Sequence, residues 1–153
     1  MPANFSSHAY SLRSATIADA ATIRQIISLV QINPMSLNWQ RFILAIDRDG
    51  KVIGCGQVKP HSDGSRELAS IAVLPEWRSK GIARAIIEHL LEQYPGRLYL
   101  TCRSRLGPLY QKFGFQALQF EEMPPYYKRL SRLVALFNKL FHQPDHLLVM
   151  RRH

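Results

Sequence analysis

The sequence has few cysteines and no long apolar run. Its 153 residues include only Cys55 and Cys102, both in apolar segments, which favours reduced, buried thiols over a disulfide framework. No apolar stretch is long enough to span a bilayer. Met1 to Tyr10 has no cationic stretch followed by an apolar one, so a secretory signal is not expected. These absences predict a cytoplasmic protein without a membrane span.

Internal repeats, low-complexity segments and Gly/Ser linkers are also missing. The hydrophobic fraction of 46% and the charged fraction of 20% are those of an ordinary globular protein. The length suits one domain, residues 1–153, with a core of its own. A metal site is not expected, because Pro144 separates the two histidines of the His142–His146 spacing.

Acidic residues are scarce: 11 stand against 20 basic ones, for a net charge of +9. This balance favours an anionic partner such as a polyphosphate cofactor, an acidic substrate, nucleic acid or a membrane surface, and does not choose among them. No helix-turn-helix, RNP motif or zinc knuckle is present, so nucleic acid is not the expected partner.

Hydrophobic periodicity and turn residues predict alternating strands and helices. The predicted strands are Tyr10–Arg13, Phe42–Ile46, Lys51–Val58, Arg66–Leu74, Leu98–Cys102, Phe115–Phe120 and Leu147–Arg151. The predicted helices are Asp19–Val30, Gly81–Tyr94, Ser104–Phe113 and Lys128–Phe141, with a short one at Trp39–Gln40. Turns are expected at Asp47–Gly50 and His61–Ser65, and Asn33-Pro34 is expected to end the first helix. This order indicates an α/β protein with a mixed sheet.

The segment from Glu67 to Arg84 carries the clearest chemistry. A strand ends at Pro75, and a basic loop then leads into a helix at Gly81. Unpaired N–H groups at a helix N-terminus, a glycine, and the charges of Arg78 and Lys80 together suit a phosphate group. Neither a Walker loop nor a GxGxxG dinucleotide fingerprint is present.

Two motifs give this segment a family resemblance. Arg78, Gly81 and Ala83 follow Ala72-Val73-Leu74-Pro75 and match the Arg/Gln-x-x-Gly-x-Gly/Ala loop that binds coenzyme A pyrophosphate in the GNAT superfamily of N-acetyltransferases. Tyr110 to Phe115 resembles the Tyr-x-x-x-Gly-Phe element of that family. The element order fits from about residue 10 to residue 120. The resemblance implies a central, mostly antiparallel twisted sheet, splayed at the acetyl-CoA strand and flanked by helices.

The resemblance also implies site residues. Glu67 would be the general base, directly or through water, and Tyr110 the proton donor to the coenzyme A sulfur. The alternatives for Glu67 are a surface carboxylate at the strand edge or an ion-pair partner of Arg66, and the alternative for Tyr110 is a half-buried core tyrosine. The residues expected to bind acetyl-CoA are Ile71, Ala72, Val73, Arg78, Ser79, Lys80, Gly81, Ile82, Ala83, Arg103 and Tyr110. Arg103 departs from the asparagine that many members carry there.

The helix expected at 128–141 is an addition, since members of the family usually have a hairpin loop here. Its apolar stripe comprises Leu130, Leu133, Val134, Phe137, Leu140 and Phe141. The stripe could pack on its own domain, lie on a membrane or bind a partner. Because the family's loop borders the acceptor cleft, we expect Tyr126 and Tyr127 to contact the acceptor.

Together these features predict an acetyl-CoA-dependent N-acetyltransferase that acts on a primary amine by direct attack in a ternary complex. No His-and-carboxylate signature adjoins either cysteine, so covalent catalysis is not expected. The rival interpretations are a basic module that binds nucleic acid or an anionic surface, and a non-catalytic acyl-CoA sensor. The acceptor is a small molecule or peptide, and the chain is a monomer or a homodimer.

Overall fold

The computed structural model describes residues 9–30, 32, 34–141 and 146–153. Several sequence-based expectations lie outside these residues: the first eight positions of the N-terminal segment, Asn33, His142 and Pro144.

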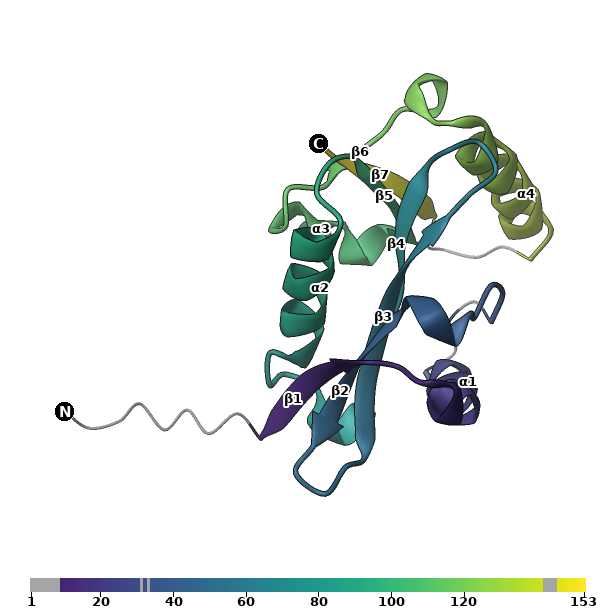
Figure 1. The fold of residues 1–153 in the computed structure, drawn as a ribbon. Helices are drawn as coiled ribbons and strands as arrows, with labels where there is room; N and C mark the ends of the chain where they lie inside the picture. Colours follow the sequence, from purple (N-terminus) through teal and green to yellow (C-terminus); the bar gives the residue numbers. More distant parts are fainter. Residues whose placement is uncertain (1–8, 31, 33, 142–145) are drawn as a thin grey trace. The chain divides into compact units, whose positions relative to one another are not determined.

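The chain alternates strands and helices over most of its length (Figure 1). The strands are β1 (Tyr10–Ser14), β2 (Phe42–Asp47), β3 (Val52–Pro60), β4 (Arg66–Val73), β5 (Leu98–Arg103), β6 (Gln116–Ala117) and β7 (Leu147–Arg152). The α-helices are α1 (Ala20–Leu29), α2 (Ile82–Gln93), α3 (Gly107–Gln111) and α4 (Pro125–Phe141). The strands form a seven-stranded mixed sheet in the order β1-β2-β3-β4-β5-β7-β6, which confirms the predicted α/β class.

The described structure groups into two compact units, and β3 and β4 contribute residues to both. The first unit comprises residues 1–58 and 70–93. Here β1, β2 and β3 run antiparallel, with Leu12 opposite Ala45 and Leu44 opposite Cys55. Helices α1 and α2 cover opposite faces of these strands (Figure 1). Each helix buries one apolar face, α1 through Ile23, Ile26 and Ile27, and α2 through Ile82, Ile86, Ile87 and Leu90.

The start of α1 is fixed by Asp19. Its carboxylate accepts hydrogen bonds from the Thr16 N–H at 2.7 Å and from the guanidinium of Arg13 at 2.8 and 3.0 Å. The bond from Arg13 outweighs the effect of burial and lowers the pKa of Asp19 to about 2. Thr16 is the N-cap of a 3-10 turn at Ile17–Asp19 that precedes the helix.

The second unit comprises residues 59–69 and 94–153. Strand β5 pairs in parallel with β4 at Tyr99 and Glu67, and in antiparallel fashion with β7 along its whole length. Its core includes Tyr99, Tyr127 and Val149. Tyr127 lies in the first turn of α4 and is 0% exposed, so this end of the helix is held by the core.

Two sequence-based expectations need correction. The strand expected at Phe115–Phe120 is only two residues long, because a 3-10 turn occupies Phe120–Glu122. Helix α4 begins at Pro125 rather than Lys128, since proline is well suited to a first helical turn. Of the alternatives left open for the stripe of α4, packing on its own domain holds for part of it: Leu130 and Val134 are half-buried, whereas Leu133, Phe137, Leu140 and Phe141 are exposed.

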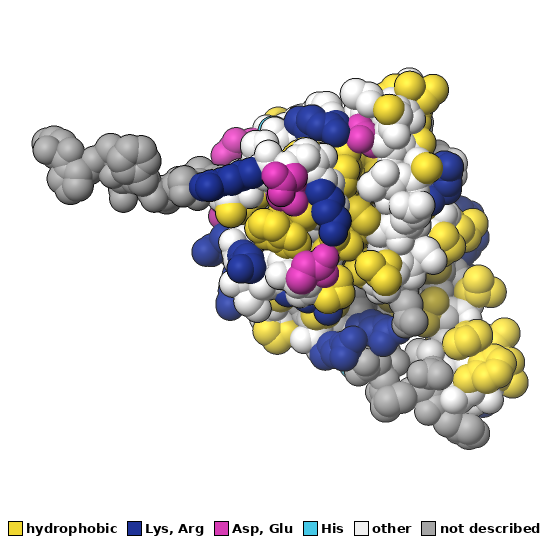
Figure 2. Space-filling model, turned by 90° about the horizontal axis from the view of Figure 1, so that it is seen from below, with side chains coloured by type: hydrophobic (Ala, Val, Ile, Leu, Met, Phe, Trp, Pro, Cys, Tyr) yellow, Lys and Arg dark blue, Asp and Glu magenta, His cyan; other side chains and the backbone are white. Residues whose placement is uncertain are grey.

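The positive charge is not gathered into one patch on the face drawn in Figure 2. Basic side chains lie there among acidic and hydrophobic ones. None of the helices in the described residues is long and apolar enough to cross a membrane. The same residues contain no group of three or more His, Cys, Asp or Glu side chains placed to hold a metal ion.

Candidate active site

The predicted phosphate loop lies in the first unit, between β4 and α2. A 3-10 turn at Pro75–Trp77 follows β4, and the backbone takes left-handed conformations at Ser79, with a φ of 63°, and at Gly81, with a φ of 80°. Arg78, Ser79, Lys80 and Gly81 are all exposed. In the described structure nothing lies within 4 Å of where a Gly81 Cβ would stand. The loop therefore offers an open helix N-terminus flanked by two cations, which fits a phosphate-bearing ligand.

Two glycines of β3 hold α2 close to the sheet. A Cβ on Gly54 would lie 3.1 Å from the carbonyl oxygen of Ala72 and 3.2 Å from Ile82. A Cβ on Gly56 would lie 2.6 Å from both Ile71 and Ile86. A Cβ at Gly56 would force the side chains of Ile71 and Ile86 to shift, and one at Gly54 would be tightly packed, so these glycines let α2 lie close to the strand.

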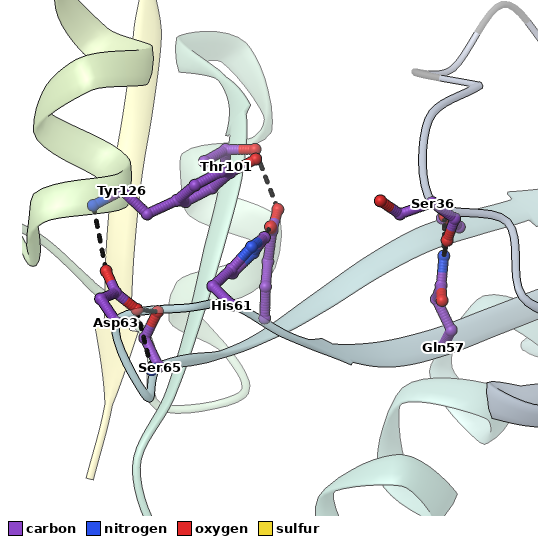
Figure 3. Close-up of polar contacts among 9 residues, drawn as sticks. Ser36, Gln57, His61, Asp63, Ser65, Thr101 and Tyr126 are labelled. Carbon is purple, nitrogen blue, oxygen red and sulfur yellow. Dashed lines mark hydrogen bonds and ion pairs between the residues drawn. The ribbon is translucent and has the colours of Figure 1, made fainter.

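Strand β4 runs through Ser70, but the φ of 58° at this residue departs from extended backbone. The Ser70 hydroxyl accepts a hydrogen bond from Gln57 Nε2 at 2.8 Å, and the same nitrogen donates to the Ser36 carbonyl at 3.2 Å (Figure 3). Ser70 thus marks an irregularity just before Ile71, Ala72 and Val73, where the expected acetyl-binding backbone lies. Nothing in the sequence pattern indicated it.

In the second unit, Glu67 is a buried carboxyl group, 5% exposed. Its Oε1 lies 2.7 Å from His61 Nε2, and its Oε2 accepts a hydrogen bond from the Thr101 hydroxyl at 3.3 Å. Buried carboxyl groups need partners of this kind. Both of its oxygens are therefore held by neighbouring side chains, which excludes the alternative of a surface carboxylate paired with Arg66.

The turn that carries His61 is bound to the start of α4. The ring of Tyr126 stacks on His61 with a centroid distance of 3.6 Å. Asp63 accepts hydrogen bonds from the Tyr126 N–H at 3.0 Å and from the Ser65 hydroxyl at 2.6 Å (Figure 3). Burial opposes ionisation of Asp63, but the hydrogen bonds from Ser65 and Tyr126 outweigh it and lower the pKa of that carboxyl. Histidine and tyrosine are thus held face to face beside Glu67.

Tyr110 lies in α3 of the second unit, edge-on to Phe115. Burial, with a smaller contribution from Cys102, raises the pKa of Tyr110 to about 12, so the hydroxyl stays protonated at neutral pH. Among the described residues that hydroxyl has no hydrogen-bond partner. A protonated, unengaged hydroxyl is suited to donate a proton.

Sequence reasoning missed the two partners of Glu67, His61 and Thr101, and also missed Lys59. Lys59 is only 5% exposed, and its ammonium has no ion-pair or hydrogen-bond partner in the described part of the chain. It is the penultimate residue of β3, two positions before His61 in the sequence.

The structure separates the remaining predicted residues by environment. Ile71 is half-buried, whereas Ala72, Val73 and Ile82 are buried. Arg103 is exposed at the end of β5. Tyr126 is half-buried beside His61, whereas Tyr127 packs on Tyr99 at a centroid distance of 5.1 Å. The residues from 70 to 83 belong to the first unit, and Glu67, Arg103, Tyr110, Tyr126 and Tyr127 to the second.

Comparison with known proteins identifies the family to which the sequence is similar. The model of the acetyltransferase (GNAT) domain matches residues 38–117, just over half of the chain. The match includes the loop at Arg78–Ala83, the buried Glu67 and Tyr110.

Relatives and structural neighbours agree with the match. The amino-acid acetyltransferase of Pseudomonas aeruginosa PAO1 is 26% identical over 125 residues, which are 74% of this chain and 29% of the relative; the chain thus spans less than a third of that protein. An uncharacterised N-acetyltransferase of Chlorobaculum tepidum is 29% identical over 126 residues, 74% of this chain and 79% of the relative.

N-acetylglutamate synthase from Neisseria gonorrhoeae, solved with coenzyme A and N-acetyl-glutamate, superposes with a TM-score of 0.68 at 20% sequence identity. The alignment covers 94% of this chain and 35% of that one. At this identity the likeness concerns the fold. With the family model, the sheet and the loop before α2 in agreement, the chain belongs to the GNAT acetyltransferase family.

Proposed function

We propose that the chain transfers an acetyl group from acetyl-CoA to a primary amine by direct attack in a ternary complex. The observation that carries this proposal is Glu67, a buried carboxyl group held by His61 and Thr101 at the position where the family resemblance implies a general base. A histidine beside the carboxyl group also suits proton transfer.

The donor side of the site is the loop before α2. The exposed N–H groups at the start of that helix, with Arg78 and Lys80, would bind the pyrophosphate of acetyl-CoA. The open space at Gly81 leaves room for it. The thioester of acetyl-CoA supplies the activated acetyl group, and the backbone of Ile71, Ala72 and Val73 would hold it. Ser79, Ile82, Ala83 and Arg103 complete the proposed cofactor-binding set.

The reaction needs two proton movements. As the amine nitrogen bonds to the thioester carbon, a proton of the amine passes to Glu67, directly or through water. His61, which is hydrogen-bonded to Glu67, would assist this proton transfer. The carbon–sulfur bond then breaks, and the departing sulfur takes the proton of the Tyr110 hydroxyl. A tyrosine with a pKa of about 12 is protonated before this step and therefore available for it.

The two thiols support direct transfer rather than an acyl-cysteine route. Burial raises the pKa of Cys55 to about 12 and that of Cys102 to about 11. The thiolate is the nucleophilic form of cysteine, and both side chains are thiols at neutral pH.

Lys59 favours an acceptor that carries a carboxylate beside its amine. The Lys59 ammonium has no ion-pair partner among the described residues, so an acidic group of a bound ligand would pair with it. The name of the Pseudomonas relative, an amino-acid acetyltransferase, agrees with this class. Tyr126, stacked on His61, would border the acceptor, while Tyr127 supports it from the core.

The experiment is a coenzyme A release screen against amino acids, polyamines and peptides, combined with calorimetry of two matched variants. Gly81→Glu should abolish acetyl-CoA binding through bulk and like charge. Gly50→Glu is the control, since Gly50 also has a positive φ, 84°, and open space around it in the described structure. Equal binding by both variants would overturn the donor site. Binding without turnover on any amine would indicate the acyl-CoA sensor instead.

A further inference from the structure

Helix α4 has two apolar sides, and only one of them meets the protein. Tyr127 is buried, and Leu130 and Val134 are half-buried, so this side packs on the second unit. The other side, here called the outer apolar face, comprises Leu133, Leu136, Phe137, Leu140 and Phe141. These residues are 53% to 67% exposed.

The outer apolar face is continuous. Its five residues fall at i, i+3, i+4, i+7 and i+8, which places them side by side along two turns of a helix. The rings of Phe137 and Phe141 also contact each other, with centroids 4.5 Å apart. Scattered single apolar residues are normal on a surface, but a contiguous patch of this size marks an interaction site.

Cations border this face. At about 100° per residue, Lys128, Arg132 and Lys139 lie in a row along its edge opposite the packed side, and Arg129 stands at its N-terminal end. The segment 125–141 contains four basic residues and no acidic one. Lys128 and Arg132 also lie over the ring of Phe120, at 5.7 and 5.1 Å, which keeps this row of charge beside the helix.

We propose that α4 docks the protein on an anionic lipid surface, with the outer apolar face in the interface and the basic row against the headgroups. A helix with Leu and Phe on one side and Lys and Arg beside them is suited to lie in the plane of such a surface. A second copy of the chain is a poorer occupant, because it would bring two helices of four positive charges together. The face is the convex side of a single helix, and a bilayer, unlike a protein groove, needs no matching shape.

Binding to vesicles tests the proposal with the intact chain. Co-sedimentation with vesicles of phosphatidylcholine alone is compared with vesicles that also contain phosphatidylglycerol. We expect binding to the anionic vesicles, little binding to the neutral ones, and weakening as salt is raised.

Two pairs of variants separate the apolar and charged contributions. Phe137→Ser with Phe141→Ser should weaken binding roughly 100-fold, and Arg132→Gln with Lys139→Gln roughly 10- to 30-fold. The apolar control is Ile17→Ser with Leu29→Ser, since Ile17 and Leu29 are 74% and 62% exposed outside α4. The charge control is Arg24→Gln with Arg48→Gln, both exposed.

All substituted residues on α4 are at the surface, and a cooperative thermal transition with unchanged acetyl-CoA affinity would confirm that each variant is folded. Absence of binding to anionic vesicles would overturn the proposal. So would α4 variants that bind as well as the parent, which would assign the binding to another cationic surface. A parent that sediments as a dimer, with the Phe137/Phe141 variant monomeric, would identify a second copy as the occupant. Capture by an acidic polypeptide but not by vesicles would identify a protein partner.

Discussion

Because Glu67 and His61 are paired, we expect their substitutions to have non-additive effects on kcat. His61 Nε2 lies 2.7 Å from Glu67 Oε1, and both side chains are largely buried. A general base contributes about 10²–10⁴-fold to turnover, so Glu67→Gln and His61→Gln should each lower kcat by this order. Independent contributions would multiply to roughly 10⁴–10⁸-fold in the double variant, whereas a single unit gives a double variant close to the larger single effect.

Single-turnover release of coenzyme A, measured with an amine identified by the screen, gives these rates. The stability of each variant is measured in parallel by unfolding in urea, because loss of the hydrogen bond to a buried carboxyl group costs about 1–3 kcal/mol of stability. Thr101→Val is the matched control: it removes the longer bond of 3.3 Å and leaves His61 in place. Its effect on kcat should be much smaller than that of either main variant.

The pKa of Tyr126 provides a second readout. Burial is the largest cause that raises this pKa, and the negative charge of Glu67 raises it further. Glu67→Gln should therefore lower the pKa of Tyr126 toward the ordinary value of 10. A double variant whose defect equals the product of the single defects would refute the reasoning. Full activity in His61→Gln would also refute it and leave Glu67 acting alone.

Three further predictions concern other parts of the site. Tyr110→Phe should lower kcat about 10²-fold or more and leave the affinity for acetyl-CoA unchanged. Since the pKa of Tyr110 is raised from 10 to about 12, the parent should lose no rate through ionisation of this hydroxyl between pH 7 and 10. A decline in the parent's rate over this range that disappears in the variant would contradict the prediction. Gly56→Ala should destabilise the protein by about 1–3 kcal/mol through overpacking, measured in urea, and Ile71→Val should recover part of the loss; an unchanged midpoint would show that the contact relaxes freely. Lys59→Met should raise KM for carboxylate-bearing amines roughly 10- to 100-fold and leave uncharged amines unaffected; equal effects on both would remove its proposed role.

Most of the fold could be predicted from local pattern. The turn at Asp47–Gly50, the proline after β4 and the apolar face of α2 set element boundaries to within one or two residues. Local pattern failed where tertiary structure decides. The sequence after Phe115 alternates like a strand, yet β6 comprises only Gln116 and Ala117, followed by one more hydrogen bond to β7 from the Leu118 N–H to the Val149 carbonyl.

The site was predicted from motifs, and its polar partners were not. Glu67 and Tyr110 stand in recognisable motifs, whereas His61 stands in a turn with no pattern around it. Its proximity to Glu67 depends on the register of the hairpin, in which the His61 N–H donates to the Ser65 carbonyl at 2.9 Å. Register depends on how the whole turn folds, so one-dimensional spacing did not reveal it.

Helix α4 shows a different limit. Periodicity predicted an apolar stripe on α4, but it did not indicate which of the apolar side chains pack against the protein. Tyr127 decides this, since its ring lies among Tyr99 and Val149 and turns the helix so that Leu130 and Val134 face inward. The rest of the stripe is left exposed.

The two buried cysteines have a practical consequence for measuring this protein. Reagents that detect free thiols by colour react with thiolates at the surface, and Cys55 and Cys102 are neither exposed nor ionised at neutral pH. A colorimetric signal from the native protein with its substrates therefore reports released coenzyme A, with little background from the chain itself. In denaturant the same two side chains become reactive, so the number of titratable thiols per chain serves as a direct count of unfolded molecules.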